Sequence, residues 1–391
     1  MSASLAGPVA GIVATFAILL AAGFHATPYN NYVLLADAFR HGRTWIDWPG
    51  PYIDALSYAG RYYVIEAPLP AVLLLPAVLA FGKAADQSLL AALLGGVALY
   101  AAWEICRRLR VPLPSAALLC GFLLLGTDLF WCAMLGDVWF IAHVSSVAFT
   151  LLALLELLGR RRGWLVAILG ACAVESRFAL LLALPVYAVL LGLPRGLPGD
   201  ERSPDERRRA VLAFALALVP FAIGWVWYNE LRWGVPYDIG YAAWYHQDQV
   251  GEPTGSPFRL SYVPYELYSF FVRFPDVRGT FPFLIPTLNG VALSWTSPAL
   301  LLAFLARRPR PLVVAMWSAA VLTAIPSFLY YVNGFAQFGM RHALDFEPFL
   351  FVLMALAARR GLHAIGTALC LFSMLAGAWG IWYWRAFIRT G

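Results

Sequence analysis

Four carboxylates lie close together in the segment between the first apolar run and the next clear one. They are Asp37, Asp47, Asp54 and Glu66, and tyrosines and tryptophans are interspersed among them. A carboxylate can take a proton from a hydroxyl group or hold that group by hydrogen bonds, and aromatic faces stack on the apolar faces of sugar rings. These residue types suit a substrate that carries hydroxyl groups, with Asp37 and Glu66 as candidate catalytic bases.

A further carboxylate, Asp137, lies in a Gly-Asp turn between two apolar runs. At the outer end of a membrane span, next to Trp139 and His143, its side chain is expected to face the same aqueous vestibule as the first-loop acids. Asp137 is therefore a third candidate base. The alternative for Asp37 and Asp137 is structural, because an Asp at the start of a helix can cap the free backbone amides there.

A smaller group of basic side chains is expected to bind a phosphate group: Arg61, Arg177, Arg341 and His342. The guanidinium fork of Arg matches phosphate oxygens through parallel hydrogen bonds. An Arg near the headgroup plane would also meet a lipid-linked phosphate where that phosphate must lie, since the lipid tail stays in hydrocarbon. The alternative for each Arg is an ion pair with a membrane phospholipid or with a carboxylate such as Glu175 or Asp345.

The composition is that of a polytopic membrane protein. Hydrophobic residues make up 61% of the 391 residues, charged residues make up 13%, and the mean hydropathy is +0.70. The formal charge of +6 comes from arginines that cluster at the ends of apolar runs, which indicates membrane topology and anionic lipid headgroups rather than a nucleic-acid partner. The five cysteines have no ligand spacing, so neither a disulfide framework nor a zinc site is predicted.

The apolar runs predict an all-α bundle of about eleven transmembrane spans in a single domain, residues 1–391. The expected spans lie near 7–24, 87–106, 113–132, 140–158, 163–176, 178–194, 210–229, 287–306, 311–331, 346–358 and 363–384. The apolar element 67–82 is short and interrupted by prolines, so its topology is ambiguous. If it does not cross, the Arg clusters all fall on one side, which the positive-inside rule makes cytoplasmic. Residues 25–86 then form a first external loop with surface helices, and residues 230–286 form a second.

Five stretches resemble poorly characterised bacterial membrane proteins that are grouped with the C-type integral membrane glycosyltransferases. They are NNYVLLADAFRHGR, AGRYYVIEAPLPAVLLLP, YNELRWGVPYDIGY, SWTSPALL and FGMRHALDFEPFL. That superfamily uses polyprenyl-phosphate sugars and includes the protein mannosyltransferases and the lipid A aminoarabinose transferases. The resemblance covers most of the chain, and it implies a C-type fold with its active face outside the cytoplasmic membrane.

The resemblance also implies positions for the site. In that superfamily an acid just after the first span usually acts as the catalytic base or binds the acceptor, but this chain has Asn30-Asn31 there, and an amide cannot take a proton. Asp37, about two helical turns further on, is the nearest replacement, and Asp137 matches a second acidic position. Arg341 resembles the Arg of a late outer loop. The residues expected to bind the sugar or the acceptor are Asn30, Asn31, Tyr32, Tyr62, Tyr63, Tyr237 and Asp238.

The expected function is inverting transfer of a sugar from a polyprenyl-phosphate donor to a lipid, glycan or protein acceptor in the bacterial cell envelope. The alternative is a non-catalytic protein on the same scaffold, such as a lipid-linked glycan carrier, a flippase or a binding partner of another transferase. No cofactor is predicted from the residues. Some relatives use a divalent cation, and Asp37, Asp47 and Asp54 are the residues that could gather one.

Overall fold

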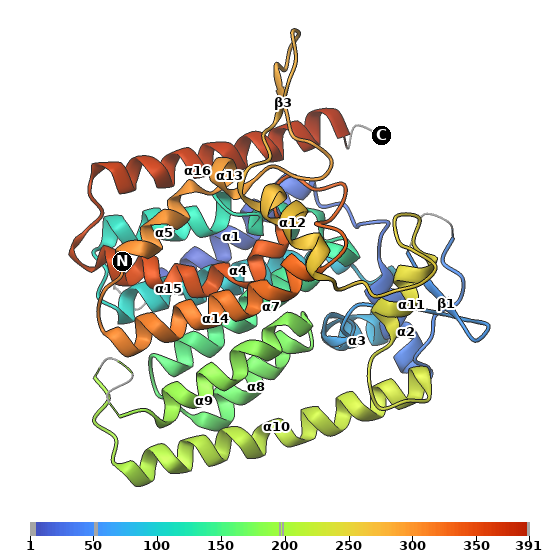
Figure 1. Cartoon of the computed structure of the whole chain (residues 1–391), viewed down its shortest axis with the longest axis horizontal. Helices are drawn as coiled ribbons and strands as arrows, with labels where there is room; N and C mark the ends of the chain where they lie inside the picture. The colour runs from blue at the N-terminus through green and yellow to red at the C-terminus, as the bar shows by residue number, and fades with distance from the viewer. Residues whose placement is uncertain (1–4, 51–53, 195–196, 198, 389–391) are drawn as a thin grey trace.

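The computed structural model describes residues 5–50, 54–194, 197 and 199–388. Long helices run side by side through the body of the molecule (Figure 1). Five of the described helices are long and apolar enough to cross a membrane: α4 (Gln87–Arg108), α7 (Val138–Leu157), α10 (Pro204–Trp233), α14 (Arg310–Leu329) and α16 (Ala364–Tyr383), which continues as a π-helical turn, η7 (Trp384–Ile388). The predicted all-α, multi-pass membrane architecture is therefore confirmed.

The expected number of eleven spans is not confirmed. A sixth span arises if α5 (Leu113–Leu125) and α6 (Leu129–Leu135), which meet at a bend of 48°, cross the membrane as one. The other apolar elements of the bundle are shorter: α1 (Ala6–Ala22), α8 (Gly163–Val174), η2 (Phe178–Ala183) with α9 (Leu184–Gly192), α13 (Leu293–Thr296) with η4 (Pro298–Leu305), and α15 (Glu347–Ala357). Pro298 explains one break, because a proline has no backbone N–H to continue a helix.

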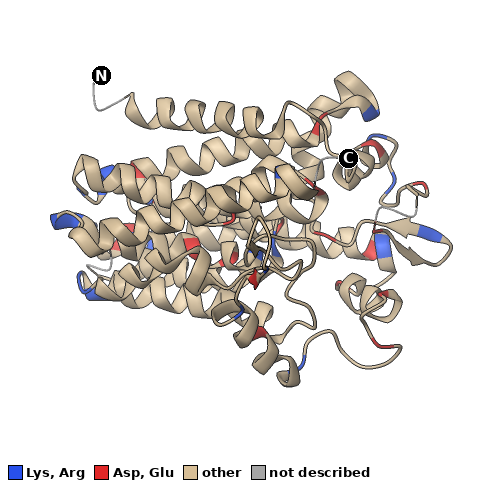
Figure 2. Ribbon diagram, turned by 90° about the horizontal axis from the view of Figure 1, so that it is seen from above, with Lys and Arg blue, Asp and Glu red and all other residues tan. Residues whose placement is uncertain are grey.

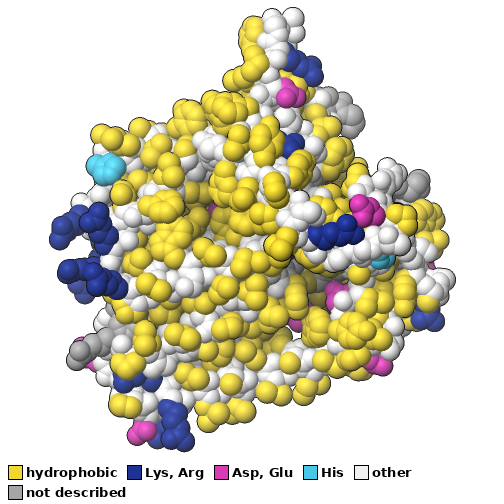
Figure 3. Space-filling model, in the orientation of Figure 1, with side chains coloured by type: hydrophobic (Ala, Val, Ile, Leu, Met, Phe, Trp, Pro, Cys, Tyr) yellow, Lys and Arg dark blue, Asp and Glu magenta, His cyan; other side chains and the backbone are white. Residues whose placement is uncertain are grey.

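Charge distinguishes the two ends of the bundle. Figures 2 and 3 show Lys and Arg residues gathered at the left end of the helices. The order of elements agrees with this: α4 ends at Arg108, α14 begins at Arg310, and the 3-10 turn η6 (Ala358–Arg360) lies between α15 and α16. Arg residues at one end of alternating helices are the pattern of the positive-inside rule.

The first long loop folds at the opposite end, on the right of Figure 1. It contains α2 (Asn31–Arg40), the hairpin β1 (Leu56–Tyr58) with β2 (Arg61–Tyr63), α3 (Leu69–Phe81) and the turn η1 (Gly82–Ala84). The apolar element of ambiguous topology is thus a 13-residue helix with Pro76 inside it. It lies beside α2 at this end rather than among the long helices (Figure 1).

The second long loop covers part of the same end. After α10 the chain forms α11 (Gly240–Gln247), the turn η3 (Leu260–Tyr262), α12 (Val263–Phe271) and a short hairpin of β3 (Asp276–Val277) with β4 (Leu284–Ile285). The side chain of Gln247 on α11 donates to the backbone carbonyl of Ser57 on β1, at 2.6 Å. The two loops therefore form one cap over the end of the bundle.

Candidate functional site

The centre of the candidate site is a buried ion pair between two segments that are 168 residues apart. Arg177 lies at the break between α8 and η2, and Asp345 ends the 3-10 turn η5 (Arg341–Asp345). Arg177 donates through Nε and Nη2 to the two carboxylate oxygens of Asp345, at 3.1 and 2.8 Å. The Asp345 side chain is 0% exposed, and that of Arg177 is 19% exposed. A bidentate pair of this kind fixes both segments in position.

His143 completes this pair as a triad. His143 is a buried residue of α7, and its Nδ1 lies 3.4 Å from Oδ1 of Asp345. Burial alone would raise the pKa of Asp345, but Arg177 and His143 together hold that pKa below its ordinary range. Asp345 is therefore a carboxylate at neutral pH, and Arg177 is held in place by a permanent negative charge.

Arg341 and His342 lie next to the triad and are both buried. Arg341 donates through Nη1 to the side-chain oxygen of Gln337 at 3.0 Å and to the backbone oxygen of Phe335 at 3.2 Å. The ring centroids of His342 and His143 are 5.2 Å apart. Two of the predicted phosphate-binding residues thus share this cluster with Arg177, while Arg341 uses part of its donor capacity to hold the loop before η5.

Glu66 faces the same region from the first loop. The residue is half-buried, and its Oε2 atom is enclosed with no hydrogen-bond partner among the described residues. Burial raises the pKa of Glu66 to about 7; Asp54 adds to the rise, whereas Arg177 and Arg232 oppose it. A carboxyl group with a pKa near 7 can both take up and release a proton at neutral pH.

Tyr32 and Tyr241 lie close to both Glu66 and Arg177. Burial raises the pKa of Tyr32 well above its ordinary value, with Glu66, Tyr241 and Arg177 close enough to affect it. The hydroxyl of Tyr32 on α2 and that of Tyr228 on α10 are buried with no hydrogen-bond partner in the described part of the chain. Such unpaired polar groups are costly in a folded protein. The hydrogen-bonding capacity of these two hydroxyls is therefore not used by any described residue.

Asp137 occupies a neighbouring polar cluster at the end of the first helix. It lies at the N-terminal boundary of α7, and its carboxylate accepts a hydrogen bond from the Thr27 hydroxyl. The Thr27 amide bonds to the Ser88 hydroxyl at 3.0 Å, and Gln87 donates to the Gly136 carbonyl at 2.7 Å. This cluster joins three segments, so Asp137 has a structural task whether or not it also takes part in chemistry.

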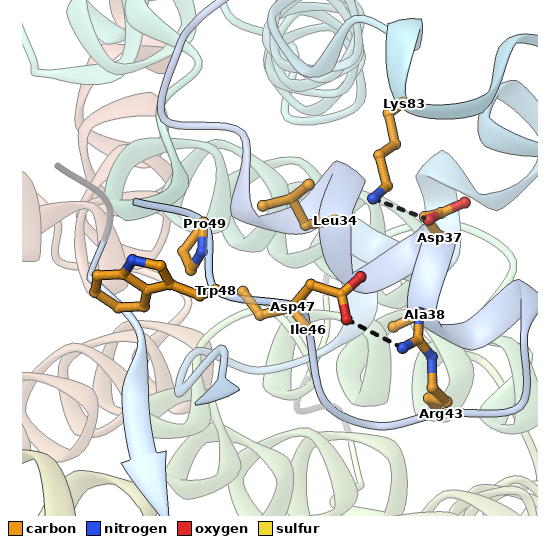
Figure 4. A pocket seen from close by; sticks show the side chains of 9 residues that line it. All are labelled: Leu34, Asp37, Ala38, Arg43, Ile46, Asp47, Trp48, Pro49 and Lys83. Atoms are coloured by element: carbon orange, nitrogen blue, oxygen red, sulfur yellow. Dashed lines mark hydrogen bonds and ion pairs between the residues drawn. The ribbon is translucent and has the colours of Figure 1, made fainter. Parts of the chain in front are cut away.

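Asp37 lies in a separate small pocket of about 70 Å³, which α2 lines together with Asp47 and Lys83 (Figure 4). Its carboxylate is 3.7 Å from Lys83 Nζ and 3.9 Å from His41 Nδ1. Asp47 in the same pocket pairs with Arg43 at 3.2 Å. Both carboxylates therefore have cationic partners, and Asp37 lies on the middle of its helix rather than at its cap.

The remaining predicted residues have varied surroundings. The Arg61 guanidinium lies over the Trp45 ring, 3.7 Å from its centroid, and the Tyr62 ring packs on Trp48 at 4.8 Å. Tyr63 packs on Trp233, also at 4.8 Å.

Four other residues complete the predicted set. Asn30 precedes α2 and is half-buried, whereas Asn31 is buried and donates to the Asp54 carbonyl at 2.8 Å. Tyr237 is exposed, and Asp238 accepts from the Gly240 amide at 2.7 Å at the start of α11. Of all the predicted residues, the structure brings together Glu66, Tyr32, Arg177, Arg341 and His342.

The structure gathers no metal site from the candidate residues. Among the described residues no group of three or more His, Cys, Asp or Glu side chains is placed to hold a metal ion. Asp54 accepts from the Trp139 indole at 3.1 Å, while Asp37 and Asp47 have the separate partners described above. Asp37 and Asp47 thus share one pocket but have different basic partners, and Asp54 is bound elsewhere to Trp139.

The arrangement of the helices has a counterpart among solved structures. The crystal structure of ArnT from Cupriavidus metallidurans bound to undecaprenyl phosphate matches 99% of this chain, with a TM-score of 0.56 and 15% sequence identity. The chain has a C-type glycosyltransferase-like fold. It spans 66% of the length of ArnT, and at this identity the likeness is one of fold. No family model matches the chain, and no curated protein matches it either.

The fold expected from the sequence resemblance is thus confirmed, but the sequence did not single out all of the site. Asp345 and His143 were neighbours of candidate residues rather than candidates, and Tyr228 and Tyr241 were not distinguished from other loop aromatics. The signal for Asp345 was its place in the segment RHALD, beside two predicted phosphate-binding residues. Asp345 and Glu175 were both named as alternative ion-pair partners for the arginines. The pairing of Asp345 with Arg177 depends on contacts between distant segments.

Proposed function

We propose that the protein transfers a sugar from a polyprenyl-phosphate donor to a hydroxyl group of a lipid, glycan or protein acceptor. The observation that carries this proposal is the placement of the half-buried Glu66 carboxyl group near the fixed Arg177 guanidinium, at the end of the bundle opposite the arginine clusters. A base and a phosphate-binding cation are the two groups that such a transfer needs. The fold shared with ArnT, which was solved with undecaprenyl phosphate bound, supports the choice of a lipid-linked phosphate.

In this proposal Glu66 takes the proton of the acceptor hydroxyl as the acceptor oxygen attacks the anomeric carbon of the sugar. The bond between that carbon and the phosphate oxygen breaks, and its electron pair leaves with the polyprenyl phosphate. Arg177 stabilises the charge on the departing phosphate. Its bonds to Asp345 use Nε and Nη2, so in this proposal Nη1 is the nitrogen that donates to the phosphate. Asp37 and Asp137 remain alternative bases.

The second candidate function is a non-catalytic carrier or scaffold for a lipid-linked glycan. The feature that favours it is Asn30-Asn31, since this pair stands where the related transferases have an acid. The Nδ2 group of Asn31 is engaged with the Asp54 carbonyl, so this residue has a structural use in the cap. A carrier would bind the same lipid phosphate without breaking the sugar–phosphate bond.

Both candidates require recognition of the phosphate, which a thermal-unfolding experiment tests. We expect undecaprenyl phosphate to raise the Tm of the purified protein and undecaprenol, its phosphate-free counterpart, to have little effect. A ligand that binds only the folded state at 100 times its Kd stabilises that state by about 2.7 kcal/mol. Equal shifts with the two lipids would mean that only the tail is recognised, and would contradict a phosphate site.

A further inference from the structure

The hairpin of β3 and β4 stands apart from the rest of the second loop. Asp276 pairs with Ile285 and Val277 with Leu284, and the Arg278 amide donates to the Phe283 carbonyl at 2.7 Å. In Figure 1 the hairpin projects away from the bundle past α16, roughly at right angles to the long helices. If those helices cross a bilayer, the hairpin therefore extends along the plane of the membrane.

The base of the hairpin is fixed to the bundle, so its direction is set by the fold. The ring of Phe274 packs on Trp295 of α13, with centroids 4.8 Å apart, and the Ala292 amide donates to the Arg273 carbonyl at 3.0 Å. The projecting part is a continuation of this anchored segment.

The projecting surface is apolar. Val277 is 80% exposed, Phe281 68% and Phe283 55%. Figure 3 shows hydrophobic side chains along the hairpin, with a basic and an acidic side chain beside them; the exposed charged residues of this segment are Asp276 and Arg278. Two phenylalanines and a valine on such a slender element would be unfavourable in water.

The contacts of the hairpin define its depth relative to the helices. The Phe281 ring lies 5.9 Å from that of Trp382 and 6.4 Å from that of Phe387, at the far end of α16 and in η7. This end is opposite Arg359 and Arg360, which precede α16. Aromatic residues at the end of a transmembrane helix are typical of the interface between hydrocarbon and headgroups. The hairpin is thus at the level of the outer interface.

We propose that the β3–β4 hairpin inserts into the outer leaflet of the membrane as a lateral anchor. Its phenylalanines enter the boundary between headgroups and acyl chains, and Arg278 binds lipid phosphates. The lipid bilayer is the occupant because the apolar surface of the hairpin continues the lipid-facing side of α16, where Leu371 and Leu375 are 46% and 70% exposed. This inference is independent of the chemistry proposed for the site.

A fluorescence-quenching experiment tests the insertion. An environment-sensitive dye is attached to Thr280→Cys at the hairpin tip, in a background where Cys172, the native cysteine that is not buried, is replaced by serine. The matched control is the same dye on Thr254→Cys, an exposed residue of the loop between α11 and α12. The protein is reconstituted in vesicles of phosphatidylethanolamine and phosphatidylglycerol. Quenchers are either carried on the lipid acyl chains or dissolved as iodide.

We expect lipid-borne quenching to be several-fold stronger at position 280 than at position 254, and iodide quenching to be correspondingly weaker. The double substitution Phe281→Asp and Phe283→Asp should remove the lipid-borne quenching. Because the Phe281 ring contacts Trp382 and Phe387, the Tm of this variant is measured alongside to confirm that it is folded. Strong iodide quenching at position 280 would overturn the proposal. Protection from both quenchers would overturn it as well, since it would mean that a protein partner or a second copy covers the hairpin.

Discussion

Glu66→Gln is expected to lower kcat for sugar transfer by about 10²–10⁴-fold, the usual contribution of a general base. The amide keeps the shape of the side chain but cannot accept the proton of the acceptor hydroxyl. Because burial raises the pKa of Glu66 to about 7, we also expect wild-type kcat to fall as the pH drops below about 7, where the carboxyl group is protonated. The measurement is the pH profile of kcat for both proteins.

The controls for this prediction are Asp37→Asn and Asp137→Asn. Asp37 pairs with Lys83 in its own pocket, and Asp137 accepts from Thr27, so we expect each substitution to change kcat far less than Glu66→Gln does. All three variants should still bind undecaprenyl phosphate. If either Asp variant lost transfer while Glu66→Gln kept it, the base would be that Asp and the assignment of Glu66 would be wrong.

Arg177→Met is expected to lower the free energy of unfolding by about 3–5 kcal/mol, the cost of leaving one partner of a buried ion pair uncompensated. Asp345 would remain as a fully enclosed carboxylate. Because its pKa is held below the ordinary value, the pair stabilises the wild type above the unfolded-state pKa of about 3.9 and loses this contribution as the pH falls further. Thermal unfolding in detergent at pH 7 measures the difference.

The matched control is Arg43→Met, which breaks the pair of Arg43 with Asp47 in the small pocket beside α2. The side chain of Arg43 is 30% exposed and that of Asp47 is 69% exposed. Exposed ion pairs of this kind contribute about 0–1 kcal/mol to the free energy of unfolding. The double variant Arg177→Met with Asp345→Leu should recover much of the lost stability, since it removes the unpaired charge as well. A loss for Arg177→Met no greater than that for Arg43→Met would show that the buried pair does not hold the site together.

The membrane architecture could be predicted from the sequence because it depends on local properties. Long apolar runs give helices such as α4, α7 and α14, and the positive-inside rule uses the arginines at their ends to predict which ends are cytoplasmic. Pro68, Pro70 and Pro76 marked the element that became α3 as unlike its neighbours. The likeness to the ArnT fold agrees with these patterns.

The number of spans was harder to predict because hydropathy does not report how a helix ends. Residues 287–306 were expected to form one span but fold as α13 and η4 on either side of Ser297. Residues 163–194 were expected as two spans and give α8, η2 and α9, with Glu175, Ser176 and Arg177 at the break. This break between α8 and η2 places Arg177 within hydrogen-bond distance of Asp345.

The composition of the site was predicted only in part, for a related reason. The sequence indicated which side chains could bind phosphate or take a proton, but not which of them have partners. Asp37 pairs with Lys83, whereas Oε2 of Glu66 has no hydrogen-bond partner among the described residues, although the two carboxylates look equivalent in sequence. The partner of Arg177 lies 168 residues away, and only the packing of α7, α8 and η5 brings the two together.

The most direct test of the central claim is whether the protein breaks the bond between a sugar and polyprenyl phosphate. Purified protein is incubated with a panel of radiolabelled polyprenyl-phosphate sugars and a bacterial membrane-lipid extract, with Glu66→Gln in parallel. The account predicts release of free polyprenyl phosphate and label in an acceptor with the wild type, and neither with Glu66→Gln. Donor binding without release in any acceptor fraction would contradict the transferase assignment and favour the carrier.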